Sequence, residues 1–195
     1  MNDSLQRVAL RACQTALFPL IALCWWEEKR AGERWFAACG ELLSLIPGWL
    51  GSLMRKAFYR ATIRACADRA YISFGVLLVW RSISVGRDVY IGPYSIIGSA
   101  TIGNGVKIAS RVSITSGRHQ HGQDRVADDP TPTLEPVTIG DGSWIGEGAI
   151  VMADIGTRCI VGAGSVVVRP VPDGAVVVGN PARALAAAAP QRVAS

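Results

Sequence analysis

A six-residue repeat between Val85 and Val168 constrains the fold of this chain more than any other feature. An aliphatic residue opens each unit, and in most units a small side chain follows four residues later. The aliphatic positions are Val85, Ile91, Ile97, Ile102, Ile108, Ile114, Ile139, Ile145, Val151, Ile155, Val161 and Val167. The small positions are Val89, Ser95, Thr101, Val106, Val112, Ser143, Ala149, Cys159 and Ser165. A fixed period with two inward positions per unit predicts a parallel β-solenoid, because each short strand buries one side chain and glycine lets the chain turn.

The composition is that of a globular protein with a positive charge. The chain has 195 residues, 50% of them hydrophobic and 18% charged, and a formal net charge of +5. That charge suits an anionic cofactor or an anionic membrane surface. No basic cluster with interleaved aromatic residues is present, so we expect no nucleic-acid partner. The five cysteines form no CxxC pair, and Cys159 falls on an inward position, so we expect a reduced, cytoplasmic chain.

Three segments follow from these patterns. Residues 1–70 predict a helical extension, residues 71–185 the solenoid, and residues 186–195 a C-terminal tail. Hydrophobic residues recur at helical spacing across 5–24 and 41–66, with a loop at Pro47-Gly48. The apolar run 15–26 is short for a membrane span, and no small-residue cleavage site of a signal peptide follows it.

The helical extension supports two compatible interpretations. Four of the six tryptophans lie in its first fifty residues, and basic residues follow them; these residues are Trp25, Trp26, Trp35, Trp49, Arg55, Lys56 and Arg60. Tryptophan beside leucine with basic neighbours is typical of a helix that lies peripherally in a membrane interface. The other interpretation is a helical cap that covers the open end of the first solenoid coil.

The repeat stops after Ile114 and resumes at Val137. The segment between, 116–136, is polar and rich in Gly, Pro and Asp, which predicts an extruded loop. A loop of this length in a tight solenoid tends to carry function. It contains both histidines of the chain, His119 and His121. Without a third histidine or a nearby cysteine they form a poor zinc set, so we expect a catalytic base here, the alternative being two solvated loop side chains.

Several motifs together resemble the bacterial hexapeptide-repeat acyltransferases. They are the repeat, the loop histidine, VTIGDGSWIG at 137–146, VGAGSVV at 161–167 and VGNPAR at 178–183. The chain is most similar to the maltose/galactoside O-acetyltransferase-like group and to its exopolysaccharide-modifying relatives. The resemblance implies a mainly β fold, a left-handed parallel β-helix with an N-terminal helical extension, assembled as a homotrimer with active sites between subunits. It also implies acetyl-CoA as donor and no metal.

A general base near neutrality would activate the acceptor hydroxyl, and histidine suits that role because its ordinary pKa is about 6.5. By resemblance the base is His119, at the end of the run TSGRH, and His121 is the second candidate. Glu135 is a candidate carboxylate for orienting the imidazole, and Asp124, Asp128 and Asp129 are equally available.

The resemblance places donor binding in the second block of repeats. The backbone at Gly146 and Ala163 would line the pantetheine groove, and Trp144 would flank the active site. Arg169 stands where the family usually has a lysine that meets the phosphates of the coenzyme, and Arg183 is a second candidate. Arginine also pairs well with phosphate, so an arginine in place of that lysine is compatible with binding of the coenzyme phosphates. The geometry of the repeat, without any donor binding, explains Gly146 and Ala163 equally well.

The acceptor cannot be read from the motifs. The resemblance implies Asn and Asp on the early coils for a free disaccharide, whereas this chain has Gly92 and Ser99 there. We therefore expect the acceptor of this O-acetyltransferase to be a glycan or polysaccharide precursor, such as a lipid-linked saccharide. A small soluble acceptor of the serine or antibiotic type is the alternative. A γ-type carbonic anhydrase needs three metal-binding histidines per site, and a non-catalytic scaffold leaves the loop histidine unexplained.

Overall fold

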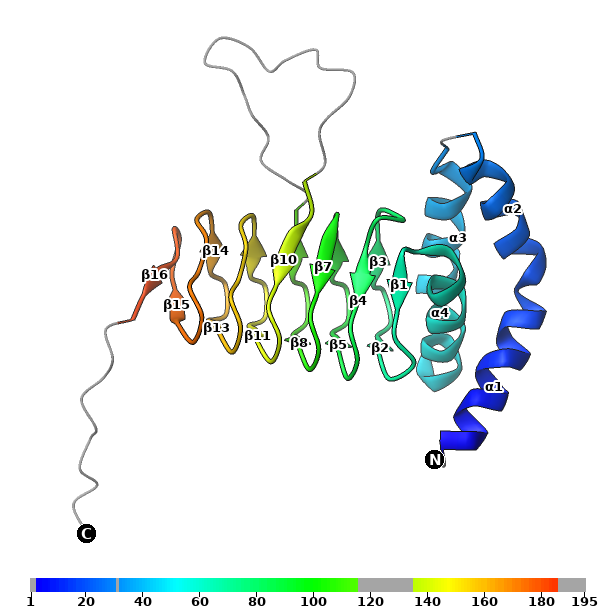
Figure 1. Ribbon diagram of the computed structural model, residues 1–195, viewed down its shortest axis with the longest axis horizontal. Helices are drawn as coiled ribbons and strands as arrows, with labels where there is room; N and C mark the ends of the chain where they lie inside the picture. The colour runs from blue at the N-terminus through cyan, green and yellow to red at the C-terminus, as the bar shows by residue number, and fades with distance from the viewer. Residues whose placement is uncertain (1–2, 31, 116–134, 186–195) are drawn as a thin grey trace.

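The computed structural model describes residues 3–30, 32–115 and 135–185, which form a solenoid capped by helices at its N-terminal end (Figure 1). The helices are α1 (Asp3–Ala16), α2 (Phe18–Glu28), α3 (Arg34–Ser44) and α4 (Gly48–Thr62). The strands are β1 (Ala65–Cys66), β2 (Tyr71–Ile72), β3 (Leu77–Leu78), β4 (Ser84–Val85), β5 (Tyr90–Ile91), β6 (Ile96–Ile97), β7 (Ala100–Ile102), β8 (Lys107–Ile108), β9 (Ser113–Ile114), β10 (Val137–Ile139), β11 (Trp144–Ile145), β12 (Ile150–Val151), β13 (Ile160–Val161), β14 (Val166–Val167), β15 (Val176–Val178) and β16 (Arg183–Ala184).

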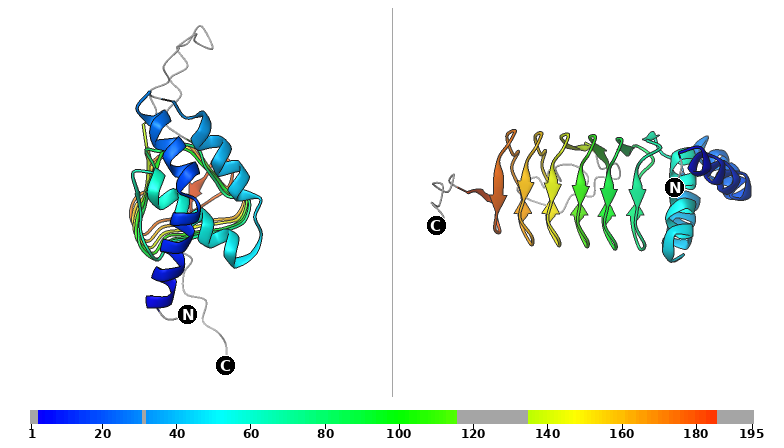
Figure 2. Two further views of the ribbon diagram at one scale, coloured as in Figure 1. Left: turned by 90° about the vertical axis from the view of Figure 1, so that its right-hand side faces the viewer. Right: turned by 90° about the horizontal axis from the view of Figure 1, so that it is seen from below.

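The strands build three sheets, because each coil contributes one strand to each face of a three-sided prism (Figure 2). Sheet A holds β1, β4, β7 and β10, and sheet C holds β3, β6, β9, β12 and β14. Sheet B runs from β2 through β5, β8, β11, β13 and β15 to β16. All pairs are parallel except β15 with β16, which is antiparallel and ends sheet B. The parallel β-solenoid predicted from the six-residue period is therefore confirmed.

Aliphatic side chains stack into three continuous inward ladders, one behind each sheet. Residues of one ladder occupy the same register on successive strands, so each side chain covers its neighbour in the next coil. Sheet A supplies Val85, Ile102, Ile139, Ile155 and Val171; sheet B supplies Ile72, Ile91, Ile108, Ile145, Val161 and Val177; sheet C supplies Leu78, Ile97, Ile114, Val151 and Val167. All are buried, which confirms the inward aliphatic positions.

The small inward positions are confirmed with one exception. Ser143 is fully buried, and its hydroxyl donates to Gly156 O at 2.7 Å and accepts from Cys159 N at 3.0 Å, so a corner serine ties neighbouring coils together. Thr101 was expected inside and is exposed. The expectation failed because β7 has three residues, and alternation along it turns Ala100 and Ile102 inward and Thr101 outward.

The insertion leaves the solenoid unbroken. β10 pairs with β7 in the register Val137 to Ala100, and Val137 N donates to Ser99 O at 3.0 Å. The chain thus leaves the prism after β9 and rejoins the next coil at β10. Residues 116–134 of the predicted loop lie outside the described residues.

Helices α3 and α4 cover the open end of the first coil. Arg55 of α4 is fully buried and its Nε donates to Ile72 O of β2 at 3.3 Å, while Tyr59 Oη accepts from Leu78 N of β3 at 3.3 Å. Gly75 N donates to Ser44 O at the end of α3 at 2.9 Å. These bonds satisfy backbone groups that the first coil would otherwise leave unpaired, so the helical extension acts as a cap.

A buried ion cluster fixes the outer helices to this cap. Glu27 of α2 accepts from Trp35 N at 2.9 Å and thereby caps the N-terminus of α3. Arg81 of the first coil donates to Glu27 Oε2 at 3.4 Å and to Cys24 O at 3.1 Å. Its Nε also lies 3.3 Å from Glu33 Oε2, an ion pair without hydrogen-bond geometry.

The helical periodicity of the extension was predicted, but its breaks were not all found. The loop at Pro47-Gly48 is confirmed, since α3 ends at Ser44 and α4 begins at Gly48. The stretch expected as one helix, 5–24, instead breaks at Leu17, and residues 65–66 form strand β1. Arg55 was counted among the basic residues available to a membrane, which is wrong because it is fully buried.

Among the described residues, no single helix combines the length and apolar character that a membrane crossing needs. The pair Val8–Ala16 and Phe18–Glu28, bent by 66°, meets that requirement together by length and composition alone.

Candidate active site

The two histidines, His119 and His121, lie outside the described residues, so the structure defines only the ends of their segment. Thr115 follows β9, and its backbone N donates to Val151 O at 3.0 Å. Glu135 is exposed just before β10. The segment therefore leaves sheet C and returns to sheet A, at the corner of the prism that joins these two faces.

Gly146 and Ala163 meet at the corner between sheets B and C. Gly146 N donates to Val161 O at 2.7 Å, and a Cβ added to Gly146 would lie 2.5 Å from Ala163 N. The two coils thus approach too closely for any side chain at Gly146. Ala163 is exposed, so at this corner the surface of the solenoid consists of backbone and a methyl group.

Trp144 lies on the outer face of sheet B, 45% exposed, between Lys107 and Ile160 of the neighbouring strands. Its ring points away from the core because Ile145, the next residue of β11, fills the inward position. The donor candidates Trp144 and Gly146 are therefore two residues apart on one coil.

Both candidate arginines belong to the last coils. Arg169 is exposed two residues after β14. Arg183 is exposed on β16, where it pairs with Val178 of β15, and its Nη1 donates only to Ala182 O at 3.1 Å. Ala182 N in turn donates to Val166 O of β14 at 2.8 Å, so the segments that carry the two arginines are hydrogen-bonded to each other. Neither guanidinium forms an ion pair with a described acidic residue.

Burial raises the pKa of four cysteine thiols, those of Cys13, Cys24, Cys39 and Cys66, which makes them weak nucleophiles near neutrality. Burial raises the pKa of Cys24 to about 12 and that of Cys66 to about 11, so both remain thiols near neutrality. Cys159 is fully buried, and its Sγ lies 3.0 Å from Pro172 O. Within 3–30, 32–115 and 135–185, no group of three or more His, Cys, Asp or Glu is placed to hold a metal ion.

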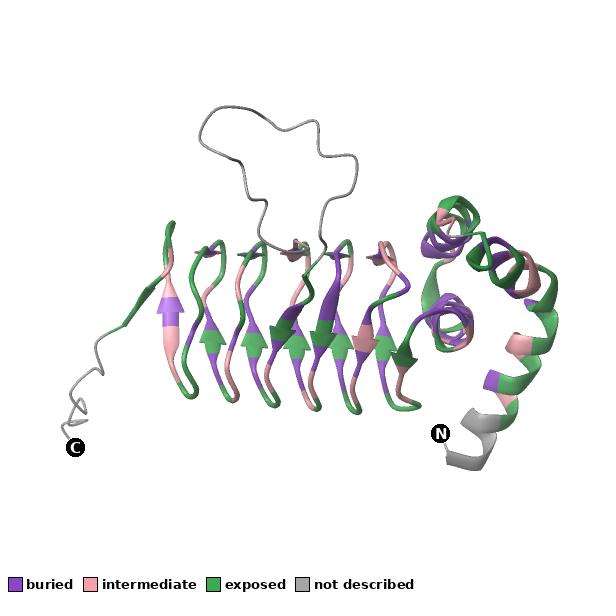
Figure 3. Ribbon diagram, turned by 45° about the horizontal axis from the view of Figure 1, so that its top comes forward, coloured by how far each residue is buried: buried purple, intermediate pink, exposed green. Residues whose placement is uncertain are grey.

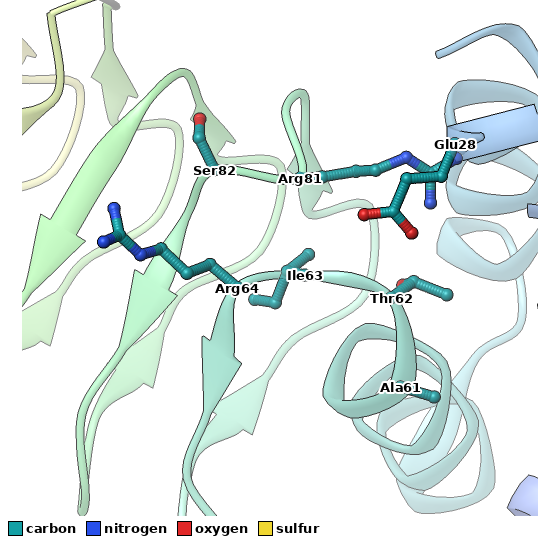
Figure 4. Close-up of a pocket in the computed structure, with 7 residues that line it drawn as sticks. All are labelled: Glu28, Ala61, Thr62, Ile63, Arg64, Arg81 and Ser82. Atoms are coloured by element: carbon teal, nitrogen blue, oxygen red, sulfur yellow. The ribbon is translucent and has the colours of Figure 1, made fainter. Parts of the chain in front are cut away.

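A cavity of about 410 Å³ at the junction of cap and solenoid was not anticipated from the sequence (Figure 4). It is lined by Glu28, Ala61, Thr62, Ile63, Arg64, Arg81 and Ser82. The guanidinium of Arg64 points away from Arg81, which extends toward Glu28 and the helices, so the two arginines do not converge on one anion. The cavity lies beside β1, at the opposite end of the solenoid from Arg183.

The repeat matches two descriptions of transferase families. Residues 82–116 match "Bacterial transferase hexapeptide (six repeats)", and residues 136–169 match "Hexapeptide repeat of succinyl-transferase". The two matches stop on either side of the segment with the histidines. Repeat, sheets and ladders together define a hexapeptide-repeat transferase solenoid.

Similarity to individual proteins assigns the chain to a family within this group of transferases. It is 35% identical over 121 residues to a protein of Escherichia coli (strain K12) named "Putative lipopolysaccharide biosynthesis O-acetyl transferase WbbJ", covering 56% of this chain and 59% of that one. It is 33% identical over 132 residues to "Putative acetyltransferase YJL218W" of Saccharomyces cerevisiae (strain ATCC 204508 / S288c), covering 65% and 67%. The chain thus belongs to the hexapeptide-repeat acetyltransferase family, and it spans about three fifths to two thirds of these relatives.

A solved structure supports the same fold. The crystal structure of a maltose O-acetyltransferase from Clostridium difficile 630 superposes with a TM-score of 0.64 at 24% identity, over 78% of this chain and 84% of that one. The expected left-handed parallel β-helix with an N-terminal helical extension is thereby confirmed.

Proposed function

We propose that this protein is an O-acetyltransferase that moves an acetyl group from acetyl-CoA to a hydroxyl of a saccharide in a glycan or polysaccharide precursor. The observation that carries the proposal is a family solenoid whose repeat is interrupted by one long insertion, which contains both histidines of the chain. The relative named for lipopolysaccharide O-acetylation supports a glycan acceptor.

The proposed reaction is a direct transfer within a ternary complex. The imidazole of His119 takes the proton of the acceptor hydroxyl as its oxygen attacks the thioester carbonyl carbon. The C–S bond then breaks, an ester forms, and the coenzyme leaves as a thiolate that is protonated to the thiol. Backbone N–H groups of a coil corner are suited to stabilise the oxyanion between these steps.

The order of the strands supports the proposed donor position. In sheet C, β12 lies between β9, which leads to the histidine segment, and β14, which precedes Arg169. Two interstrand spacings amount to about 10 Å along the solenoid. An extended pantetheine arm exceeds this length, so a thioester near His119 would leave the coenzyme phosphates near Arg169 and Arg183. Gly146 lies on the coil of β12 and Ala163 on the coil of β14, so both lie along this path.

The outer faces of the prism support a homotrimer with shared sites. The outward residues of sheet A are Ala65, Ser84, Thr101 and Thr138, those of sheet B are Tyr71, Tyr90, Lys107, Trp144, Ile160 and Val176, and those of sheet C are Leu77, Ile96, Ser113, Ile150 and Val166. Sheets B and C are thus the apolar faces. A cyclic trimer joins two different patches of neighbouring copies, which these faces supply. Trp144 would then lie beside a partner subunit.

The base assignment is tested by His119→Ala, with His121→Ala as the matched control. We expect His119→Ala to lower acetyl transfer by about two to four orders of magnitude, the usual contribution of a general base. The control should lose much less. Transfer is followed as thiol release from acetyl-CoA in the presence of an oligosaccharide acceptor, and donor binding is followed by calorimetry.

Donor affinity should stay within about twofold in both variants, because a base that acts on the acceptor does not hold the coenzyme. Unchanged thiol release in the His119 variant would refute the assignment. Acetylation of serine or an aminoglycoside in preference to every saccharide tested would refute the acceptor class while leaving the base in place.

A further inference from the structure

Helix α2 lies in the outermost layer of the protein and yet is apolar on the side that faces solvent. Helices α1 and α2 pack on α3 and α4, which in turn pack on the first coil, so α1 and α2 form the blunt end of the molecule (Figures 1 and 2). Ile21, Cys24 and Glu27 form the inner side of α2. A helix in this position normally carries polar residues on its outer side.

The outer side of this layer exposes large apolar side chains instead. Val8 is 68% exposed, Phe18 57%, Trp25 44% and Trp26 52%. Phe18 and Trp25, one near the start and one near the end of α2, touch edge to face with ring centroids 6.4 Å apart, so they form one continuous surface along this helix. Figure 3 shows the exposed residues along both helices. We call Val8, Phe18, Trp25 and Trp26 the end patch.

Basic side chains border the end patch. The guanidinium of Arg30 lies 3.9 Å from the ring centroid of Trp26, and Arg11 of α1 and Lys29, which directly follows α2, are exposed. Residues 1–64 contain nine Lys or Arg against five Asp or Glu, and the surplus is still three when buried Arg55 is left out, whereas the remaining 131 residues contain eleven against ten. The positive charge of the protein is therefore concentrated at the end that carries the patch.

We propose that the end patch docks on the surface of an anionic lipid bilayer. Tryptophan favours the boundary between headgroups and acyl chains, and neighbouring Lys and Arg favour anionic lipid. Pairing with the end patch of a second molecule would bring two surfaces of like charge together, which electrostatics opposes. The cap function of α3 and α4 uses the other side of the same helical unit, so capping and docking do not compete.

The docking geometry suits the proposed trimer, although the proposal does not depend on acetyl transfer. Copies that pack along sheets B and C in a closed ring all place their helical units at the same end. Three end patches would then meet one membrane together, and the second and third would bind at high effective concentration.

The test is sedimentation of the full-length protein with vesicles of phosphatidylcholine containing phosphatidylglycerol. The wild-type protein should bind, and Phe18→Ser with Trp26→Ser should weaken binding by at least about tenfold, because two exposed aromatic side chains that would insert into the lipid are lost. The matched control, Val168→Ser with Leu185→Ser, removes two exposed apolar side chains at the far end of the chain and should bind as the wild type does.

Varying the salt concentration and the lipid composition distinguishes the electrostatic part of the membrane attraction from the apolar part. Binding should weaken in high salt and on pure phosphatidylcholine vesicles, since the basic border interacts with lipid charge. Absence of binding at low salt, or an equal loss in the control, would overturn the proposal. So would a doubling of the assembly mass that Phe18→Ser with Trp26→Ser abolishes, because the patch would then join two copies. Light scattering and circular dichroism of both double variants show that each remains folded and assembled.

Discussion

Arg55 is fully buried between the cap and the first coil without an acidic partner. Its guanidinium donates to Leu43 O at 2.9 Å, Ser44 O at 3.4 Å, Ile46 O at 2.8 Å and Ile72 O at 3.3 Å. It thereby supplies donors both to carbonyl groups at the C-terminal end of α3 and to a carbonyl group at the free edge of β2. Burial lowers the pKa of the guanidinium, but arginine stays charged and the carbonyl oxygens compensate the charge.

Arg55→Met should therefore lower the free energy of unfolding by about 3 kcal/mol, because several buried carbonyls lose their donor. Urea unfolding followed by circular dichroism measures the effect. Arg60→Met on the same helix is the control, since Arg60 is exposed and pairs with exposed Asp68, and it should change stability by less than about 1 kcal/mol. Equal losses in the two variants would contradict the role of Arg55.

Buried thiols and a buried phenol predict a loss of stability at alkaline pH. Burial raises the pKa of Tyr59 from 10.0 to about 12, that of Cys24 from 9.0 to about 12, and that of Cys66 from 9.0 to about 11. Above pH 9 the unfolded chain releases these protons first and binds fewer than the folded chain, so stability falls as pH rises. The urea midpoint should decline from pH 9 onward.

Tyr59→Phe isolates one of these groups. At neutral pH the variant should lose about 1 kcal/mol, because Leu78 N loses its acceptor. Above pH 10 its stability should fall less steeply than that of the wild type, because one of the groups that ionise only in the unfolded state is gone. Parallel curves for the two proteins would show that Tyr59 does not contribute to the decline.

The repeat predicts the inward residues well and the special residues poorly. Period and strand alternation are local properties, so positions such as Ile91 and Ser143 could be assigned inside from spacing alone. Thr101 was misplaced because a five-residue step changes which residue of a longer strand points inward. Arg55 could not be distinguished from Lys56 and Arg60, since only the packing of α4 on the coil decides which basic side chain becomes buried.

At the scale of elements, glycine performs two different tasks in the turns of the solenoid. A Cβ added to Gly140 would lie 2.5 Å from Gly156 C, so at this corner the backbone of one coil touches the next. Gly148 has a φ of +67° with nothing within 4 Å, so there the constraint is conformation rather than space.

Gly140→Ala should therefore cost more than Gly148→Asn. The first substitution forces two coils apart, which we expect to cost about 3 kcal/mol or more. The second should cost less than about 1 kcal/mol, because asparagine tolerates the left-handed conformation. Thermal unfolding midpoints give the order. A larger loss of stability for Gly148→Asn would contradict this order. It would mean that adjacent coils can move apart at little cost and that the positive φ at Gly148 is the stronger constraint.

Residues of the candidate site that follow the six-residue repeat could be located from the sequence, whereas those outside the repeat could not. Gly146 and Ala163 lie on adjacent coils and against each other, while their role in donor binding stays a prediction; the continuation of the solenoid across the insertion followed from the restart at Val137. The roles of His119, His121 and Glu135 stay predictions, since no repeat fixes where their side chains lie. The start of α3 was missed because Glu27, which caps it, comes from the preceding helix.

At the scale of the whole molecule, the three faces of the prism differ in ways that the repeat alone does not reveal. Outward Tyr71 and Tyr90 stack on sheet B with ring centroids 5.6 Å apart, and Ile160 on the same sheet is 42% exposed. On sheet C, Ile96 is 47% and Ile150 39% exposed. Rows of apolar side chains on two faces, next to a third face of Ala, Ser and Thr, are the observation on which the proposed homotrimer rests, because large exposed apolar patches favour association.

Light scattering should accordingly give about three times the chain mass of 20.7 kDa. Ile160→Glu on sheet B and Ile150→Glu on sheet C should each reduce the assembly to monomers, because an unpaired carboxylate would be buried in the interface. Thr138→Glu on sheet A, an equally exposed strand position, should leave the trimer intact. Acetyl transfer should fall with the trimer in the first two variants, since the proposed site needs residues of two copies. A wild-type monomer with full activity, or dissociation caused by Thr138→Glu alone, would contradict this assembly.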